Sequence, residues 1–361
     1  MSLRAAPRLM AALWGLAAMG AAAQPTAALQ PLAAETITQA LARPIGQPVR
    51  APRTSGTLEL QGKRVYVAEY MLLFDLSGEL PATPQGGQVL GTAVGAGVGA
   101  GVGDKPAVLA YRSAPDIGAL QLLTDRAWAD LQARLQTAGV PLADPIETVR
   151  QHGAVYAATE PASTALAPVV LSAKSGDTER RYLALAPTGM RLVARTVAGI
   201  GLGNLAARVA FPAQGVEGLS LAMALHFSAL DTTGQRPSTF AAAPGAAASQ
   251  PAISPLMELA PAPAAALVHA HAQLSLVNLG EALVLAGEFA RLRPQPAVDA
   301  PLRENLGPLL SLGRRLLGGP VAPRVEALLE LDGPSTARLA LYALFAGNQA
   351  IADALKAARQ P

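Results

Sequence analysis

The alternation of apolar and polar residues predicts that this chain contains several strands. Residues 64–74 are dense in Val, aromatic and aliphatic side chains, and the run stops at Asp75, as a buried strand would. Residues 217–230 carry apolar side chains at period two, and residues 267–292 alternate in the same way apart from an irregularity at Gly280. Two shorter apolar runs, 169–173 and 181–186, also predict strands, with a turn-prone stretch between them.

Apolar residues at helical spacing predict several helices. The clearest follows Thr124, which can cap it, and places Trp128, Leu131 and Leu135 on one face before a natural stop at Gly139. Further helices are expected over 204–211, 302–317, 325–331 and 335–358.

The first 23 residues have the three parts of a secretory signal. Arg4 and Arg8 supply the positive start, an apolar stretch runs from Leu9 to Gly20, and three alanines precede Gln24. The apolar stretch is shorter than the roughly 20 residues that span a bilayer. We therefore expect export to the periplasm or beyond, with residues 1–23 removed.

Three segments of biased composition divide the rest of the chain. Residues 24–58 are rich in Pro, Ala and Gln and predict a poorly ordered lead-in. Residues 79–106 form a Pro- and Gly-rich insertion, and residues 232–265 form a low-complexity connection of Pro, Ala, Ser and Thr. These boundaries predict an α/β domain over 59–295 and a helical region over 296–361.

Charge and cysteine content exclude several classes of function. Lys and Arg number 28 against 25 Asp and Glu, and loss of Arg4 and Arg8 leaves the two signs nearly balanced. Such a chain has no basic field for nucleic acid, so we expect no nucleic-acid partner. The absence of cysteine excludes disulfides, thiol nucleophiles and a lipidated N-terminal cysteine.

The most unusual motif is GTAVGAGVGAGVG at residues 91–103. Gly91, Gly95, Gly99 and Gly103 are four apart, so on a helix they would form a stripe that another helix can approach closely in a membrane. Read as a strand, the segment presents a flat glycine face suited to self-pairing. A flexible insertion and a phosphate-binding loop are the other readings, and we expect membrane contact or self-association through these four glycines.

Other chemical motifs are incomplete. Residues 199–203 contain the first two glycines of the dinucleotide-binding motif G-x-G-x-x-G, but Asn204 occupies the position of the third glycine. A tight turn before a helix is therefore expected. His269 and His271 would share one face of a strand, where a solvated face is a simpler reading than a metal site. Asp75 and Glu79 could be paired carboxylates, although a polar loop end accounts for them. Signatures of serine hydrolases, zinc peptidases and P-loops are absent. No catalytic, metal or cofactor residues are predicted.

The stretch RVYVAEYMLLFDLSGEL, followed after the insertion by LQLLTDRAWADLQARLQTAGV, resembles a group of uncharacterised exported bacterial proteins. Their strand–loop–helix–strand opening is similar to the periplasmic α/β domain of the curli-secretion lipoprotein family. The resemblance covers roughly residues 64–230 and implies an α/β fold without any catalytic site. That family is anchored through a lipidated cysteine, which this chain lacks.

Together these patterns predict an α/β protein, bordering on α+β, with a mixed sheet flanked by helices and a helical C-terminal appendage. The expected function is that of a non-catalytic cell-envelope protein that assembles with itself or with another envelope protein, or contacts a membrane peripherally. The alternative is a periplasmic hydrolase with a site built from loops. A buried set of perturbed carboxylates or a convergent polar pocket would favour the hydrolase.

Overall fold

The computed structural model describes most of the predicted strands and three helices. The described residues are 29–41, 51–60, 64–82, 107–143, 167–175, 178–190, 192, 216–230, 255–260, 263–268, 274–285, 287, 289–294 and 324–359. The predictions for residues 1–23, for 204–211 and for 302–317 lie outside them.

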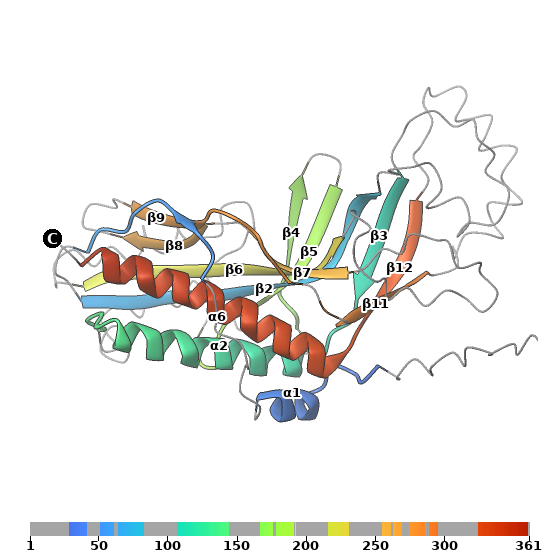
Figure 1. The fold of residues 1–361 in the computed structure, drawn as a ribbon, viewed down its shortest axis with the longest axis horizontal. Helices are drawn as coiled ribbons and strands as arrows, with labels where there is room; N and C mark the ends of the chain where they lie inside the picture. Colours follow the sequence, from blue (N-terminus) through green and yellow to red (C-terminus); the bar gives the residue numbers. More distant parts are fainter. Residues whose placement is uncertain are drawn as a thin grey trace, which may run out of the picture.

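The described chain forms one curled mixed sheet with helices against one face (Figure 1). Its helices are α1 (Ala34–Leu41), α2 (Ile117–Thr137) and α6 (Gly333–Ala357). Its strands are β1 (Thr54–Ser55), β2 (Arg64–Ala82), β3 (Ala107–Ser113), β4 (Val170–Ser175), β5 (Thr178–Leu185), β6 (Val216–Leu230), β7 (Pro255–Leu259), β8 (Pro263–Val268), β9 (Leu274–Leu279), β10 (Leu283–Leu285), β11 (Ala290–Pro294) and β12 (Arg324–Leu331). The predicted fold class, an α/β protein with a mixed sheet and a C-terminal helix, is confirmed.

The central strand β2 is longer than predicted. Instead of stopping at Asp75, it continues to Ala82, and its register with β5 shifts between Asp75 and Ser77. The first part of β2 runs parallel to β6, and its last part pairs with β3 in antiparallel register. A bulge bends a strand and increases its twist, so this irregularity lets one strand serve both halves of the curled sheet.

The helices cover the face of the sheet that carries Tyr70, Leu72 and Phe74 of β2. Alternate residues of β6, from Leu219 to Phe227, point to the same side and pack with the buried faces of α2 and α6. The opposite face carries a smaller cluster around Met71 and Leu73. The sheet therefore has a main core under the helices and a second, smaller core behind it.

The start of α2 differs from the prediction. Asp116 caps the helix by accepting a hydrogen bond from Gly118 N, and Thr124 lies inside the helix, where its hydroxyl donates to Leu120 O. The predicted end is confirmed, because Gly139 has a φ of 67° just past the helix.

The predicted helix over 325–331 is wrong. These residues form β12, which lies between β3 and β11 in the sheet. Their apolar residues fit helical spacing, but pairing on both sides decides the conformation. The final helix is confirmed as α6, which begins after Asp332 rather than after the predicted cap Ser335.

Three other expectations need correction. The low-complexity connection predicted over 232–265 contains β7 and the first part of β8, because both pair with β6. The lead-in at 24–58 contains α1 and β1, because Leu32, Ile37 and Leu58 are buried against the main core. The predicted long strand over 267–292 is instead divided among β8, β9, β10 and β11. Gly280 lies between β9 and β10, where its N–H donates to Arg53 O.

Candidate functional site

The four glycines singled out from the sequence, Gly91, Gly95, Gly99 and Gly103, lie outside the described residues. The structure does define where their segment leaves and rejoins the sheet. Ala82 and Ala107 are direct partners in the antiparallel pairing of β2 and β3. Partners in such a pair lie about 4.5–5.5 Å apart, so residues 83–106 begin and end at the same point of the sheet.

A second connection leaves the sheet in the same way. Leu230 of β6 and Pro255 of β7 are partners in an antiparallel pair, and residues 231–254 connect them. This connection has the same length as residues 83–106 but lacks the alternating glycines. Residues 231–254 can therefore serve as a control of equal length for residues 83–106.

The structure brings together a polar cluster that the sequence did not predict. It consists of Asp75 from β2, Tyr111 from β3, Arg180 and Tyr182 from β5, His226 from β6 and Glu258 from β7. Tyr182 belongs to the smaller core, whereas Tyr111 packs with the main core.

The cluster lies where two ladders of the sheet are irregular. The register of β2 against β5 shifts just after Asp75, and that of β6 against β7 shifts just after His226. His226 and Glu258 are direct cross-strand partners. Bulges often redirect side chains beside functional sites, so the polar cluster is a candidate functional site.

Tyr182, His226 and Glu258 form a hydrogen-bonded chain. The Tyr182 hydroxyl is 3.0 Å from His226 Nε2, and His226 Nδ1 is 3.4 Å from Glu258 Oε2. Tyr182 also bonds with Arg180. All three bonds are satisfied when Arg180 donates to the phenol oxygen, the phenol donates to His226 Nε2 and His226 Nδ1–H donates to Glu258.

Asp75 anchors the other half of the cluster. Its side chain is fully buried, and the Tyr111 hydroxyl lies 2.9 Å and 2.8 Å from its two oxygens. Tyr111 stands opposite Gly78 on β2, and the absence of a side chain at Gly78 makes room for the phenol. Asp75 and Glu79 are therefore strand residues, and the predicted loop end is wrong.

The pKa shifts in the cluster keep its groups in their usual forms. Burial raises the pKa of Tyr182 to about 12, although Arg180 opposes this. The hydrogen bond from His226 lowers the pKa of Glu258 despite partial burial. Burial lowers the pKa of Arg180, but Tyr111, Asp75 and Tyr182 outweigh it and raise the pKa. At neutral pH Tyr182 is thus a protonated phenol and Glu258 a carboxylate.

A separate polar chain joins the helices to the sheet. The Tyr70 hydroxyl donates to Asn348 Oδ1 at 3.2 Å, and Asn348 Nδ2 donates to Ala127 O at 2.7 Å and to Asp130 at 3.1 Å. Burial raises the pKa of Tyr70. These bonds link β2, α2 and α6 in one arrangement, so we read them as structural.

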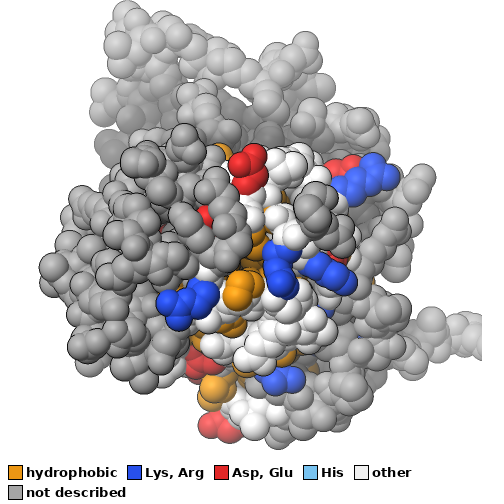
Figure 2. Space-filling model, turned by 90° about the vertical axis from the view of Figure 1, so that its left-hand side faces the viewer, with side chains coloured by type: hydrophobic (Ala, Val, Ile, Leu, Met, Phe, Trp, Pro, Cys, Tyr) orange, Lys and Arg blue, Asp and Glu red, His pale blue; other side chains and the backbone are white. Residues whose placement is uncertain are grey.

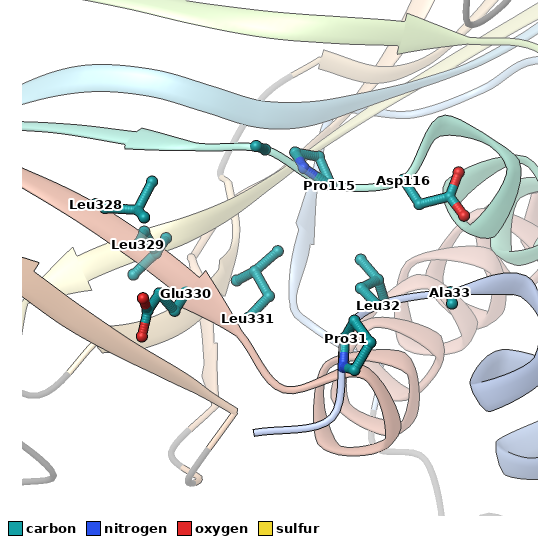
Figure 3. Close-up of a pocket in the computed structure, with 10 residues that line it drawn as sticks. Pro31, Leu32, Ala33, Pro115, Asp116, Leu328, Leu329, Glu330 and Leu331 are labelled. Atoms are coloured by element: carbon teal, nitrogen blue, oxygen red, sulfur yellow. The ribbon is translucent and has the colours of Figure 1, made fainter. Parts of the chain in front are cut away.

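A crevice opens beside the N-terminal ends of α2 and α6 (Figure 3). It has a volume of about 490 Å³ and lies where β3 and β12 end and α2 and α6 begin. The N-terminal arm, residues 29–41, forms one wall. The lining residues are Pro31, Leu32, Ala33, Ala114, Pro115, Asp116, Leu328, Leu329, Glu330 and Leu331.

The described residues also bear on surface charge, on metal binding and on membrane crossing. Figure 2 shows acidic and basic side chains interspersed on the described part of one end of the molecule. Within the described ranges, no three His, Asp or Glu side chains are placed to share a metal ion. None of the described helices is both long and apolar enough to cross a membrane.

Comparison with known proteins adds no relative. No protein-family model, no curated protein and no solved structure matches this chain. The resemblance to the curli-secretion lipoprotein family stays a prediction.

Proposed function

We propose that this protein is an exported, non-catalytic cell-envelope protein that assembles through residues 91–103, either with its own copies or with another envelope component. The observation that supports this is the pairing of Ala82 with Ala107. The glycine segment is inserted at the end of an antiparallel ladder that is closed without it. An uncharged run, in which Gly recurs every second residue from Gly95 to Gly103, thus separates two strand ends that pair directly.

The chemistry of the polar cluster agrees with a non-catalytic role. A tyrosine that acts as a base or nucleophile needs a lowered pKa, whereas burial raises that of Tyr182 to about 12. A carboxylic acid that donates a proton needs a raised pKa, whereas His226 lowers that of Glu258. The cluster is suited to fixing strands β5, β6 and β7 to one another.

The test is to replace residues 83–106 by the dipeptide Asn-Gly, which favours a two-residue hairpin turn between Ala82 and Ala107. The control replaces residues 231–254 by Gly-Ser-Gly-Ser between Leu230 and Pro255, because Pro255 has no backbone N–H with which to close a two-residue turn. We expect both proteins to fold, since shortening a loop changes its closure entropy only slightly. Sedimentation velocity and flotation with phosphatidylethanolamine–phosphatidylglycerol vesicles then measure assembly and membrane contact.

Only the first replacement is expected to abolish oligomers or vesicle binding. In the full-length chain, Gly95→Leu with Gly99→Leu should have the same effect by blocking close approach, without lowering monomer stability. Identical sedimentation and flotation for the wild type and all variants would show that residues 91–103 are only an insertion.

The order Tyr182–His226–Glu258 supports a competing proposal, a periplasmic hydrolase. A hydroxyl, an imidazole and a carboxylate in series resemble the arrangement of a nucleophile, a base and the group that orients the base. The test compares wild type, His226→Gln and Tyr182→Phe on p-nitrophenyl acetate and p-nitrophenyl phosphate. Activity that both substitutions abolish, in proteins with wild-type unfolding midpoints, would replace the assembly proposal.

A further inference from the structure

The crevice beside the N-terminal arm lies at a favourable position in the sheet. Strands β3 and β12 are parallel neighbours, with Leu329 opposite Ser113, and both end at the crevice. Crevices at the carboxyl ends of parallel strands are where α/β sheets bind ligands. Its volume of about 490 Å³ also falls within the range of roughly 300–1,000 Å³ that is usual for binding pockets.

The lining of the crevice combines apolar side chains with negative charge. Leu32 and Leu331 face each other across it in Figure 3, and Pro31 and Pro115 stiffen its walls. Apart from Asp116 and Glu330, every lining residue is apolar, and none of them is cationic. A third acid, Asp332, follows Leu331 directly.

The two acidic side chains are held in place in different ways. Asp116 is exposed, and its Oδ1 accepts the N–H of Gly118 at 2.9 Å, which fixes the carboxylate at the start of α2. Glu330 accepts a hydrogen bond from Arg293 at 3.3 Å, in an ion pair whose Arg side chain is 70% exposed. Asp116 is therefore the group that most directly meets an incoming cation.

We propose that this crevice binds a peptide segment of a partner protein that places an aliphatic side chain next to a lysine or arginine. The aliphatic side chain enters between Leu32 and Leu331, and the cation lies beside Asp116. Charge complementarity selects this occupant, because a carboxylate or phosphate ligand would lie beside the exposed carboxylate of Asp116, and Arg293 is already paired with Glu330. The lining of the crevice includes none of residues 91–103, so this proposal stands independently of the assembly proposal.

The test measures binding of a fluorescent peptide, acetyl-Gly-Leu-Lys-Leu-Gly-amide, to the whole chain by fluorescence anisotropy. Two comparison peptides carry Glu in place of Lys, or Ser in place of both Leu residues. The variant Ala114→Trp fills the crevice from an exposed position, and Ala357→Trp makes the same change at an exposed position of α6 away from it. Asp116→Asn removes the charge but keeps a good helix cap.

We expect the Lys peptide to bind more tightly than either comparison peptide. Ala114→Trp should weaken its binding about tenfold or more, as loss of a central anchor does. Asp116→Asn should weaken it roughly two- to fivefold, as loss of an exposed ion pair does, and only for the Lys peptide. Ala357→Trp should have no effect.

Three results would overturn the proposal. One is equal affinity for the Lys and Glu peptides, and another is wild-type affinity of Ala114→Trp. The third is a change in the sedimentation mass of Ala114→Trp without added peptide, because the crevice would then belong to a contact between copies of this chain.

Discussion

Replacing Gly78 by alanine tests how the buried carboxylate of Asp75 is held. A Cβ built on Gly78 lies 2.6 Å from the Tyr111 hydroxyl oxygen and 3.0 Å from its ring carbon Cζ. The ring can move away only by giving up its bonds of 2.8 Å and 2.9 Å to Asp75. The substitution therefore acts on the polar cluster through Tyr111.

The cost follows from this hydrogen bond, in which the single Tyr111 hydroxyl hydrogen is shared between both oxygens of Asp75, and from the strand itself. A hydrogen bond to a charged group contributes about 1.5–3 kcal/mol. Alanine in a strand interior is favoured over glycine by roughly 0.5–1 kcal/mol, which offsets part of that loss. Gly78→Ala should thus lower the free energy of unfolding by about 1–2 kcal/mol, and Tyr111→Phe by about 1.5–3 kcal/mol.

The decisive measurement is a double-mutant cycle. If Gly78→Ala acts by displacing the Tyr111 hydroxyl, its cost should shrink by at least about 1 kcal/mol in the Tyr111→Phe background. Urea unfolding followed by the fluorescence of Trp128 gives the four free energies. Gly118→Ala is the control, since its Cβ would meet nothing closer than Asp116 Oδ1 at 3.4 Å. Additive costs for the two substitutions, or a Gly78→Ala protein as stable as wild type, would refute the reasoning.

Three further predictions follow from other contacts. Trp128 is half-buried with its ring 5.4 Å from that of Tyr70, so Trp128→Ala should cost about 2–3 kcal/mol, less than a fully buried aromatic, as measured by urea unfolding. Asp332 accepts bonds from Ser335 N and from the N-terminal arm, so Asp332→Ala should cost about 1–2 kcal/mol and expose the arm to limited proteolysis. The lowered pKa of Glu258 stabilises the fold above its unfolded pKa, and this contribution is lost as the pH falls through the folded pKa. The urea midpoint of His226→Gln should therefore fall less between pH 6 and pH 3 than that of the wild type.

The sequence predicts elements whose pattern reflects local burial. The strand character of 64–74, the helix around Leu131 and the final helix all show their buried face directly in the spacing of apolar residues. Residues 325–331 fail this rule because β12 has neighbours on both sides, and its apolar residues then fit either period. Periodicity cannot decide such a segment without knowledge of its neighbours in the sheet.

The polar cluster could not be predicted from the sequence for a different reason. Tyr182, His226 and Glu258 come from three strands, and each reads by itself as an ordinary residue on a strand face. One signal was present, since His226 lies between apolar Leu225 and Phe227 and so had to face the side opposite the main core. The partners of that histidine depend on strand order, which one sequence does not reveal.

The pairing of the sheet also bears on how quickly the chain can fold. Val65 pairs with Glu217 and Val108 with Arg324, so both parallel ladders join residues distant in sequence. To form such a ladder the chain must close a large loop, and it loses conformational entropy before the strand contacts can compensate for that loss. Folding is therefore slow. One edge of β3 is paired only by β12, which lies near the C-terminus. The sheet therefore cannot be completed until the C-terminal part has been synthesised. If the protein is exported as we propose, this late closure would keep the chain unfolded for long enough to cross a membrane.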